Sequence, residues 1–358
     1  MTALRDLDFT IAEFAKLAGL NKQELLTLEA SGAYRTIKKR VGNVDRKFIT
    51  LADVRNFFKS GRHGDQNGVM PPKYKTQMFY NVKGGTGKST LTAQYAMYAA
   101  MKGLNVLAVD LDGQGHLTVN LDVMDAHDRP SIYDVLINDL PLKEAIMNVA
   151  PGLDLVPANL GLCNIEIPLN NKTRREYRLS EAITKIAGGY DLIVADTNPA
   201  ASILNGSMLV ASNLVAVVCA TNPLSFHGMS LVMTTIEEME REFSRDLEIK
   251  IIPNMYDNRE VISQEVLGEL HHQFADFVCQ SVVNRSVDLN EATKRRNTVW
   301  SVNAKGTAAQ DIAALSNELL YDIVPKDETE VVAVATTANP VIAVTETPIP
   351  TIQLEGQA

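Results

Sequence analysis

The sequence contains little of what would mark a secreted, metal-clustered or membrane-spanning protein. Its three cysteines, Cys163, Cys219 and Cys279, lie far apart and form no CxxC pair, so neither a disulfide framework nor a metal knuckle is indicated. Its apolar runs stay well short of the roughly 20 residues that cross a bilayer. The opening residues include Arg5 and Asp6 and form no apolar leader segment. We therefore expect a cytoplasmic protein.

Charge is distributed unevenly along the chain. The formal net charge is −9, yet residues 1–75 hold 14 Lys and Arg against 8 Asp and Glu, and the remainder carries a balance of −15. A small basic region ahead of an acidic one indicates that the first region meets a polyanion. A solvated, lysine-rich surface is the alternative, and charge alone does not decide between them.

Composition divides the chain into four parts. Residues 1–60 are compact and basic, and residues 61–75 are rich in glycine, proline and polar residues, which is typical of a linker. Residues 76–323 alternate short apolar runs with helical stretches. Residues 324–358 are rich in Thr, Val, Pro and Glu, and prolines interrupt their apolar runs, so we expect a disordered tail.

The apolar runs of the long region predict its fold. They lack in/out alternation, as expected of strands buried on both faces of a parallel sheet. Helical stretches between them, such as Leu91–Lys102, supply the crossover connections. This pattern predicts an α/β, doubly wound, mostly parallel sheet. The predicted strands are Met78–Val82, Val106–Leu111, Leu153–Pro157, Leu192–Asp196, Leu214–Ala220, Ile249–Pro253 and Phe277–Val283.

A glycine-rich loop follows the first of these strands and precedes a helix. Its glycines let backbone N–H groups surround a phosphate, and the helix N-terminus adds its dipole. Lys88 would reach the β- and γ-phosphates of a nucleotide, and the Ser89 hydroxyl would ligate Mg²⁺. Val82 occupies the first glycine position of the usual spacing, and a second lysine, Lys83, opens the loop instead. The predicted ATP-binding residues are Lys83, Gly84, Gly85, Thr86, Gly87, Lys88, Ser89 and Thr90.

This loop resembles the deviant Walker A sequence KGGxGK[ST] of the ParA/MinD family of P-loop ATPases. In that family the first lysine reaches across a dimer to the partner's nucleotide. The resemblance therefore implies a homodimer that binds ATP and Mg²⁺, with Lys83 and Lys88 as catalytic phosphate ligands.

Two further stretches carry the acidic residues of a phosphate-transfer site. Asp110 and Asp112 end a buried strand in a segment that resembles the DLDPQGNLT motif of partition ATPases, with Gly113 in place of proline. By this resemblance Asp110 helps to hold the Mg²⁺ shell and Asp112 polarises the attacking water. Asp196 follows four apolar residues and is the Walker B candidate for the metal.

The resemblance continues to about Leu320. Asn254–Arg259 resembles the TMYDxR stretch that lies beside the adenine in ParA proteins, with Asn254 where threonine is usual. This resemblance implies that Asn254 and Met255 contribute to nucleotide binding. Later stretches resemble the RNxxLxEA and KGAxAY sequences of the same branch. Cations beside them lie on the surface that meets DNA in the family, namely Arg285, Lys294, Arg295 and Arg296; a solvated helix end is the alternative reading.

The N-terminal region reads as a small winged helix-turn-helix domain. Thr10 and Asn21 are suited to cap two short helices, with a turn at Gly19. A basic hairpin around Gly42-Asn43 fits a wing, and the opening resembles MerR-type domains. The expected DNA contacts are Lys22, Gln23, Lys38, Lys39 and Arg40. A small basic domain that binds protein is the alternative.

Together these features predict a partition ATPase of a plasmid or plasmid-like phage. Its ATP dimer would bind nucleoid DNA without sequence preference, and a centromere-binding partner would stimulate hydrolysis. The N-terminal domain would bind an operator and regulate its own operon. Positioning of a protein cargo and ATP-modulated repression stay open as alternatives. Membrane positioning would need a cationic C-terminal helix, and a metallocluster ATPase would need paired cysteines, so neither is expected.

Overall fold

The computed structural model describes residues 4–60 and 70–323. The expected tail and most of the expected linker lie outside these residues. Residues 4–60 and 70–323 fall in one compact unit and share a hydrophobic core.

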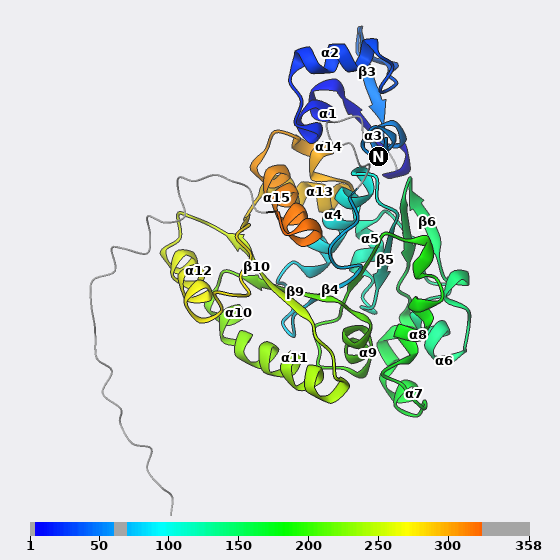
Figure 1. Cartoon of the computed structure of the whole chain (residues 1–358), viewed down its shortest axis with the longest axis vertical. Coiled ribbons are helices and arrows are strands. Elements are labelled where there is room, and N and C mark those ends of the chain that lie inside the picture. The colour runs from blue at the N-terminus through cyan, green and yellow to red at the C-terminus, as the bar shows by residue number, and fades with distance from the viewer. Residues whose placement is uncertain (1–3, 61–69, 324–358) are drawn as a thin grey trace, which may run out of the picture. The chain divides into compact units, whose positions relative to one another are not determined.

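Residues 4–60 form a three-stranded antiparallel sheet with three helices (Figure 1). After a short 3₁₀ turn at Leu4–Asp6, the elements are β1 (Asp8–Thr10), α1 (Ile11–Ala18), α2 (Lys22–Ala30), β2 (Ile37–Val41), β3 (Val44–Thr50) and α3 (Leu51–Lys59). Strand β3 lies between β1 and β2.

Local sequence explains where these first helices begin. Thr10 accepts a hydrogen bond from the Glu13 amide, and the Glu13 carboxylate accepts one from the Thr10 amide, so the first helix starts with a reciprocal cap. Asn21 and Glu24 repeat this arrangement at α2. Gly19 ends α1 in the left-handed region, with φ +67. The predicted caps and turn are confirmed.

Residues 76–284 contribute an eight-stranded sheet in the order β11-β10-β9-β4-β8-β5-β7-β6, parallel except for the β6–β7 pair. The predicted α/β, mostly parallel fold is thereby confirmed. The strands are β4 (Thr76–Tyr80), β5 (Val106–Asp110), β6 (Met147–Ala150), β7 (Leu153–Val156), β8 (Leu192–Asp196), β9 (Leu214–Ala220), β10 (Glu248–Tyr256) and β11 (Val283–Asn284).

The edges of this sheet differ from the prediction. The expected strand Phe277–Val283 is reduced to β11 and a single bridge between Ile251 and Val278. The reason is that the backbone amides of Gln280 and Ser281 donate to the carboxylate of Glu318, so these residues do not continue the ladder. At the other edge, the short antiparallel strand β6 was not predicted.

Helices cover both faces of the sheet, and a separate apolar core lies on each face (Figure 1). One core includes α4 (Lys88–Met101), α13 (Val287–Arg295), α14 (Val299–Asn303) and α15 (Thr307–Tyr321) together with the N-terminal elements. The other includes α6 (Ile132–Ile137), α7 (Glu166–Asn170), α8 (Arg178–Thr184), α9 (Ile203–Ala211), α11 (Met229–Phe243) and α12 (Val261–Gln273). Two short helices, α5 (His116–Asn120) and α10 (Pro223–His227), follow strand ends.

The N-terminal elements are joined to α4 by two cations, the buried Arg55 and the half-buried Lys102. The Arg55 guanidinium donates to the carbonyls of Ala100, at 2.9 Å, and Leu104, and to the side chain of Asn105, at 2.6 Å. These acceptors lie at and beyond the C-terminal end of α4, so a residue of α3 binds the backbone where this helix ends. In return, Lys102 donates to the carbonyl of Leu17, near the end of α1, at 3.0 Å.

Over residues 4–60 and 70–323, no helix combines the length and apolar character needed to cross a membrane.

Candidate nucleotide-binding site

The glycine-rich loop lies where β4 ends and α4 begins, at the carboxyl edge of the sheet. Gly85 and Gly87 adopt positive φ angles of +77 and +93, which side-chain-bearing residues rarely adopt. Gly87 is also the N-cap of α4, a helix of 14 residues, so the helix dipole points into the loop. The backbone therefore has the conformation and the polarity that a phosphate-binding loop requires.

Lys88 is held inside the loop. Its side chain is buried, and its ammonium group donates to the carbonyl of Lys83 at 3.2 Å, which closes the loop on itself. Burial lowers the pKa of Lys88, while the nearby carboxylates of Asp196 and Asp112 raise it. Lys83 is half-buried and makes no ion pair with any described residue. Its ammonium group thus remains available to a ligand.

Two buried asparagines brace the loop from outside. Asn81 donates to the Val218 carbonyl at 2.8 Å and accepts from the Lys83 amide at 2.9 Å. Asn254 donates to the carbonyl of Thr86 at 2.7 Å. Sequence reasoning missed Asn81, although its place directly between a buried strand and the loop is a usable signal. It predicted Asn254 as a nucleotide-binding residue, in a stretch that resembles the one beside the adenine in ParA proteins, but did not predict this contact with the loop.

The acidic residues converge on the same edge. Asp110 and Asp196 end β5 and β8 and are direct neighbours in the sheet register. Asp110 is fully buried and accepts from the Asp112 amide at 3.1 Å and from the amide and hydroxyl of Thr118 at 2.8 and 2.7 Å. Burial raises the pKa of Asp110 to about 6, although these hydrogen bonds lower it. Asp110 therefore fixes the conformation of the segment that carries Asp112.

Asp196 is in the opposite situation. It is fully buried, and no described group donates a hydrogen bond of ordinary geometry to either carboxylate oxygen. Burial first, and then the charge of Asp110, raises its pKa well above the ordinary value, while the Ser89 hydroxyl and Lys88 lower it. A buried carboxylate without hydrogen bonds is costly unless a cation balances it.

These residues fit Mg²⁺. Ser89 lies close enough to Asp196 for its hydroxyl to lower the carboxylate's pKa, and both supply the oxygen ligands that the ion prefers. The described residues contain no cluster of three or more His, Cys, Asp or Glu side chains suited to hold a metal. Mg²⁺ commonly binds through one or two carboxylates together with nucleotide phosphates. When bound, the ion would neutralise charge on the phosphate chain.

Asp112 lies in the turn after β5. It is nearly buried, and its carboxylate accepts from the Gln114 amide at 3.0 Å. The next residue, Gly113, has no room for a side chain because a Cβ there would lie 2.6 Å from the Cys163 sulfur and 2.9 Å from the Cys163 amide nitrogen. Glycine thus stands in place of the proline of the family motif because residues 160–164 pack against this position.

The predicted DNA contacts form two separate groups. Arg285 pairs with Glu260 at 2.9 Å, and the last turn of α13 holds Lys294 and Arg295, which both pair with Glu291, at 4.0 and 2.8 Å. Arg296 caps this helix in the left-handed region, with φ 55. Cations are favourable at a helix C-terminus, so this cluster also has a structural explanation.

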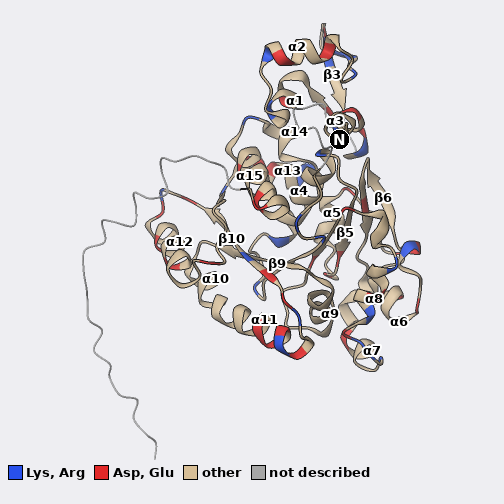
Figure 2. Cartoon of the chain, in the orientation of Figure 1, with Lys and Arg blue, Asp and Glu red and all other residues tan. Residues whose placement is uncertain are grey.

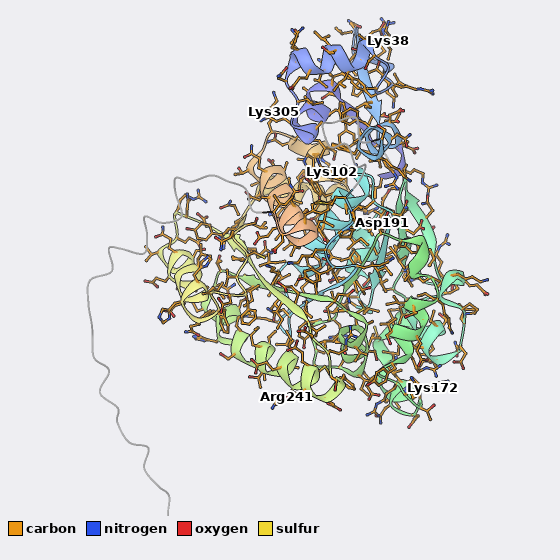
Figure 3. All side chains as sticks on the ribbon, in the orientation of Figure 1. Lys38, Lys102, Lys172, Asp191, Arg241 and Lys305 are labelled. Carbon is orange, nitrogen blue, oxygen red and sulfur yellow. The ribbon has the colours of Figure 1, made fainter. Side chains whose placement is uncertain are left out.

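The second group lies on the N-terminal hairpin (Figure 2). Lys38 faces Lys47 across the two strands, and Lys39 faces Arg46. Lys39 pairs with Asp8, and Lys47 pairs with Glu29. Lys38, labelled in Figure 3, is exposed and has no ion-pair partner among the described residues; the same holds for Arg40 and Arg46. Lys22 and Gln23 are exposed in the first turn of α2.

Fold and site together define a P-loop nucleotide-binding protein. A family model described as an AAA domain matches residues 74–249. The cell division protein PomZ of Myxococcus xanthus is 30% identical over 253 residues, which are 70% of this chain and 79% of that protein. The chromosome partitioning protein ParA of Caulobacter vibrioides is 31% identical over 244 residues, which are 67% of this chain and 91% of that protein. The chain belongs to the ParA family of ATPases.

A solved structure supports the ligand assignment. Cobyrinic acid a,c-diamide synthase of Mycobacterium smegmatis, with a bound ATP analog and magnesium, is 26% identical with a TM-score of 0.57. The match covers 68% of this chain and 95% of that one. Together with the loop geometry and the unpaired Asp196 carboxylate, this identifies ATP and Mg²⁺ as the ligands of the site.

Proposed function

We propose that this protein is a partition ATPase that segregates plasmid or plasmid-like phage DNA. Two copies enclose two ATP molecules, with Lys83 and Lys88 on the phosphates, Ser89, Asp110 and Asp196 around Mg²⁺, and Asp112 on the attacking water. The ATP dimer binds nucleoid DNA without sequence preference, and a centromere-binding, ParB-like partner stimulates hydrolysis. The N-terminal domain is a winged helix-turn-helix that binds an operator and regulates its own operon.

The observation that supports the dimer is a set of exposed apolar side chains at the edge of the sheet that carries the loop. Large apolar side chains that follow the ends of four strands are 68 to 82% exposed: Leu160 after β7, Leu224 after β9, Val261 after β10 and Val287 after β11. The carboxyl ends of parallel strands share one edge of the sheet, which is also the edge that carries Lys83. Exposed apolar side chains along the edge that carries a charged site fit contact with a second copy of the chain.

The observation that favours DNA for the N-terminal domain is the pairing of like charges. Cations directly opposite each other on neighbouring strands destabilise a hairpin. The hairpin of β2 and β3 nevertheless brings Lys38 opposite Lys47 and Lys39 opposite Arg46. The turn Gly42-Asn43 joins the strands with its glycine at φ +63, as a two-residue hairpin turn requires. A polyanion between these cations would relieve the repulsion.

Arg285, Lys294, Arg295 and Arg296 are the proposed contacts of the ATP dimer with nucleoid DNA. Their partners Glu260, Glu291 and Asp122 have side chains that are 43, 33 and 29% exposed, so a phosphate can replace them. Each phosphate that such a cation neutralises contributes a slope of about −0.9 to the logarithmic dependence of affinity on salt concentration.

The test is retention on random-sequence duplex DNA with ATP, with ADP and without nucleotide, with mass in solution measured in parallel. We expect retention and a doubled mass with ATP only. A triple change of Lys294, Arg295 and Arg296 to Ala should abolish retention on random DNA and keep the doubled mass. Changing Lys38, Arg40 and Arg46 to Ala should instead spare random DNA and remove binding to the operon's own promoter. Equal retention on random DNA with ATP, with ADP and without nucleotide would contradict the proposal.

A second candidate is suggested by PomZ, which is named a cell division protein. A ParA-family ATPase that positions a protein cargo would use the same dimer and the same nucleoid surface. The two candidates differ in what stimulates hydrolysis. A partner that stimulates only when bound to a DNA repeat array supports partition, whereas stimulation by a protein complex without DNA repeats supports cargo positioning.

A further inference from the structure

The side chain of Asn254 lies against the phosphate loop rather than in an open position beside it. Asn254 belongs to β10, is 2% exposed, and donates to the carbonyl of Thr86 at 2.7 Å. The backbone carbonyl of Asn254 accepts a hydrogen bond from the amide of Thr221, the residue after β9, at 2.9 Å. This bond fixes the end of β10. A side chain on Gly87 would overlap the Asn254 amide nitrogen. The two residues are therefore in direct contact.

The geometry of one peptide bond gives this contact a role. In a trans peptide the C=O and N–H groups point in opposite directions. The described residues contain no cis peptide bond, so the Thr86–Gly87 peptide is trans. A donor that holds the Thr86 carbonyl outward therefore directs the Gly87 N–H inward, toward the space where the phosphates bind.

We propose that Asn254 is a positioning residue that presents the Gly87 amide to the phosphate chain of ATP, and that its side chain does not read the base. This inference rests on one premise of the proposed function, namely that residues 83–90 bind phosphates. Threonine, which the family stretch has at this position, is shorter by one atom and carries no amide. This chain thus braces its loop with an amide where the family stretch that it resembles has a hydroxyl.

The neighbouring residue supports this assignment. Met255 adopts φ 57, a left-handed conformation that is uncommon for a residue with a side chain, and its terminal methyl group would touch a Cβ on Gly87. Strand β10 is distorted between Asn254 and Tyr256 in its register with β11. The strained segment thus places both residues against Gly87, as expected where backbone strain serves a site.

The test uses the full-length protein and the variant Asn254→Leu, which keeps the branching of the side chain at Cγ and removes the donor. The matched control is Asn284→Ala, because Asn284 ends the adjacent strand β11 and its amide contacts Asp311 rather than the loop. Affinities for ADP and for GDP are measured by competition against a fluorescent ADP. We expect Asn254→Leu to weaken both nucleotides about tenfold or more, since the buried Thr86 carbonyl loses its donor, with little change in the ADP/GDP ratio.

A spectroscopic readout separates positioning from a general structural effect. Thr86-Gly87 is the only Thr-Gly pair in the sequence. Labelling threonine with ¹³C at the carbonyl and glycine with ¹⁵N therefore selects the Gly87 amide alone. Addition of ADP and Mg²⁺ should shift this signal strongly in the wild type and in Asn284→Ala, and by less than half as much in Asn254→Leu.

The outcomes are distinguishable. Loss of ADP/GDP discrimination with an unchanged Gly87 shift would assign Asn254 to the base and overturn the inference, as would an unchanged affinity. If Asn254→Leu fails to fold, Asn254→Ser replaces it, because its cavity admits a water to the Thr86 carbonyl and the expected loss is intermediate. A wild-type protein that binds no ADP would refute the ATP site itself, and with it the proposed function.

Discussion

At the scale of single residues, the two lysines of the loop occupy different surroundings. Lys88 is buried and turned inward onto the Lys83 carbonyl, whereas Lys83 is half-buried without an ion pair among the described residues. This asymmetry fits a division of labour in which Lys88 binds the nucleotide of its own subunit and Lys83 that of the partner.

Lys88→Gln should weaken ADP binding at least tenfold, because a hydrogen bond to a charged group contributes about 1.5–3 kcal/mol. Lys83→Ala is the matched control and should leave the ADP affinity of the monomer unchanged. It should, however, abolish the doubled mass with ATP. Titration calorimetry and mass measurement in solution check the two expectations. Equal loss of ADP affinity in both variants would contradict the division.

Asp112 offers a prediction about turnover. Its carboxylate contacts only the Gln114 amide among described groups, so its removal leaves the Asp110–Thr118 brace intact. Asp112→Ala should therefore bind ATP normally, hydrolyse it at least tenfold more slowly, and stay on DNA as an ATP dimer. Asp112→Asn keeps the hydrogen bond and should behave in the same way. Hydrolysis at the wild-type rate would remove Asp112 from the reaction.

At the scale of elements, the sequence predicts what depends on local or periodic signals. Thr10 with Glu13 and Asn21 with Glu24 cap their helices through partners three residues away, so a reader of the sequence can find them. The order of strand, loop and helix around Lys88 is equally local. These features were predictable because no distant residue takes part in them.

What could not be predicted depends on distant partners. The apolar run Phe277–Val283 looks like a strand, yet two of its backbone amides donate to the carboxylate of Glu318. This residue lies 37 to 38 positions further along the chain. The contact of Asn254 with Thr86 spans 168 residues. No pattern within the sequence predicts these two contacts, because each is made by a single side chain and not by a ladder of backbone hydrogen bonds.

The turn after β5 gives an element-scale prediction. Gly113→Pro restores the family residue, but its ring carbons would meet the Cys163 sulfur and amide. Overpacking of this kind should lower the free energy of unfolding by about 1–3 kcal/mol. Adding Cys163→Gly should recover only part of that loss, because the backbone amide stays in place. Thermal unfolding without nucleotide measures both, and a Gly113→Pro protein as stable as the wild type would contradict the packing argument.

At the scale of the whole molecule, the helix that begins at the phosphate loop ends beside the elements of residues 4–60. Arg55 holds the carbonyls of Ala100 and Leu104 at the far end of α4, and Gly152 is without a side chain where the guanidinium passes. Arg55→Met should lower the free energy of unfolding by about 2–4 kcal/mol, because it leaves the Leu104 carbonyl and the Asn105 side chain without this donor. Denaturant unfolding measures the loss, and Arg35→Met, an exposed change in the same domain, is the control.

Lys102 makes this junction sensitive to pH. Its ammonium group donates to the Leu17 carbonyl and lies 4.0 Å from the centre of the Phe58 ring, near the C-terminal end of α4 (Figure 3). Burial lowers the pKa of Lys102 to about 8, whereas a lysine in the unfolded chain titrates near about 10.4. Between these values the unfolded chain holds one more proton than the folded one, so the free energy of unfolding rises with pH.

The slope from this one group approaches about 1.4 kcal/mol per pH unit within that window and vanishes below pH 8. Lys102→Met keeps the length of the side chain and removes the titration. Urea unfolding of both proteins from pH 7 to pH 10 isolates the effect, because every other titrating group is common to the two. The difference in stability between wild type and variant should be constant up to about pH 8 and then shift in favour of the wild type. Parallel curves across the whole range would mean that Lys102 keeps an ordinary pKa, and that the contact between residues 4–60 and α4 is looser than the hydrogen bond to Leu17 indicates.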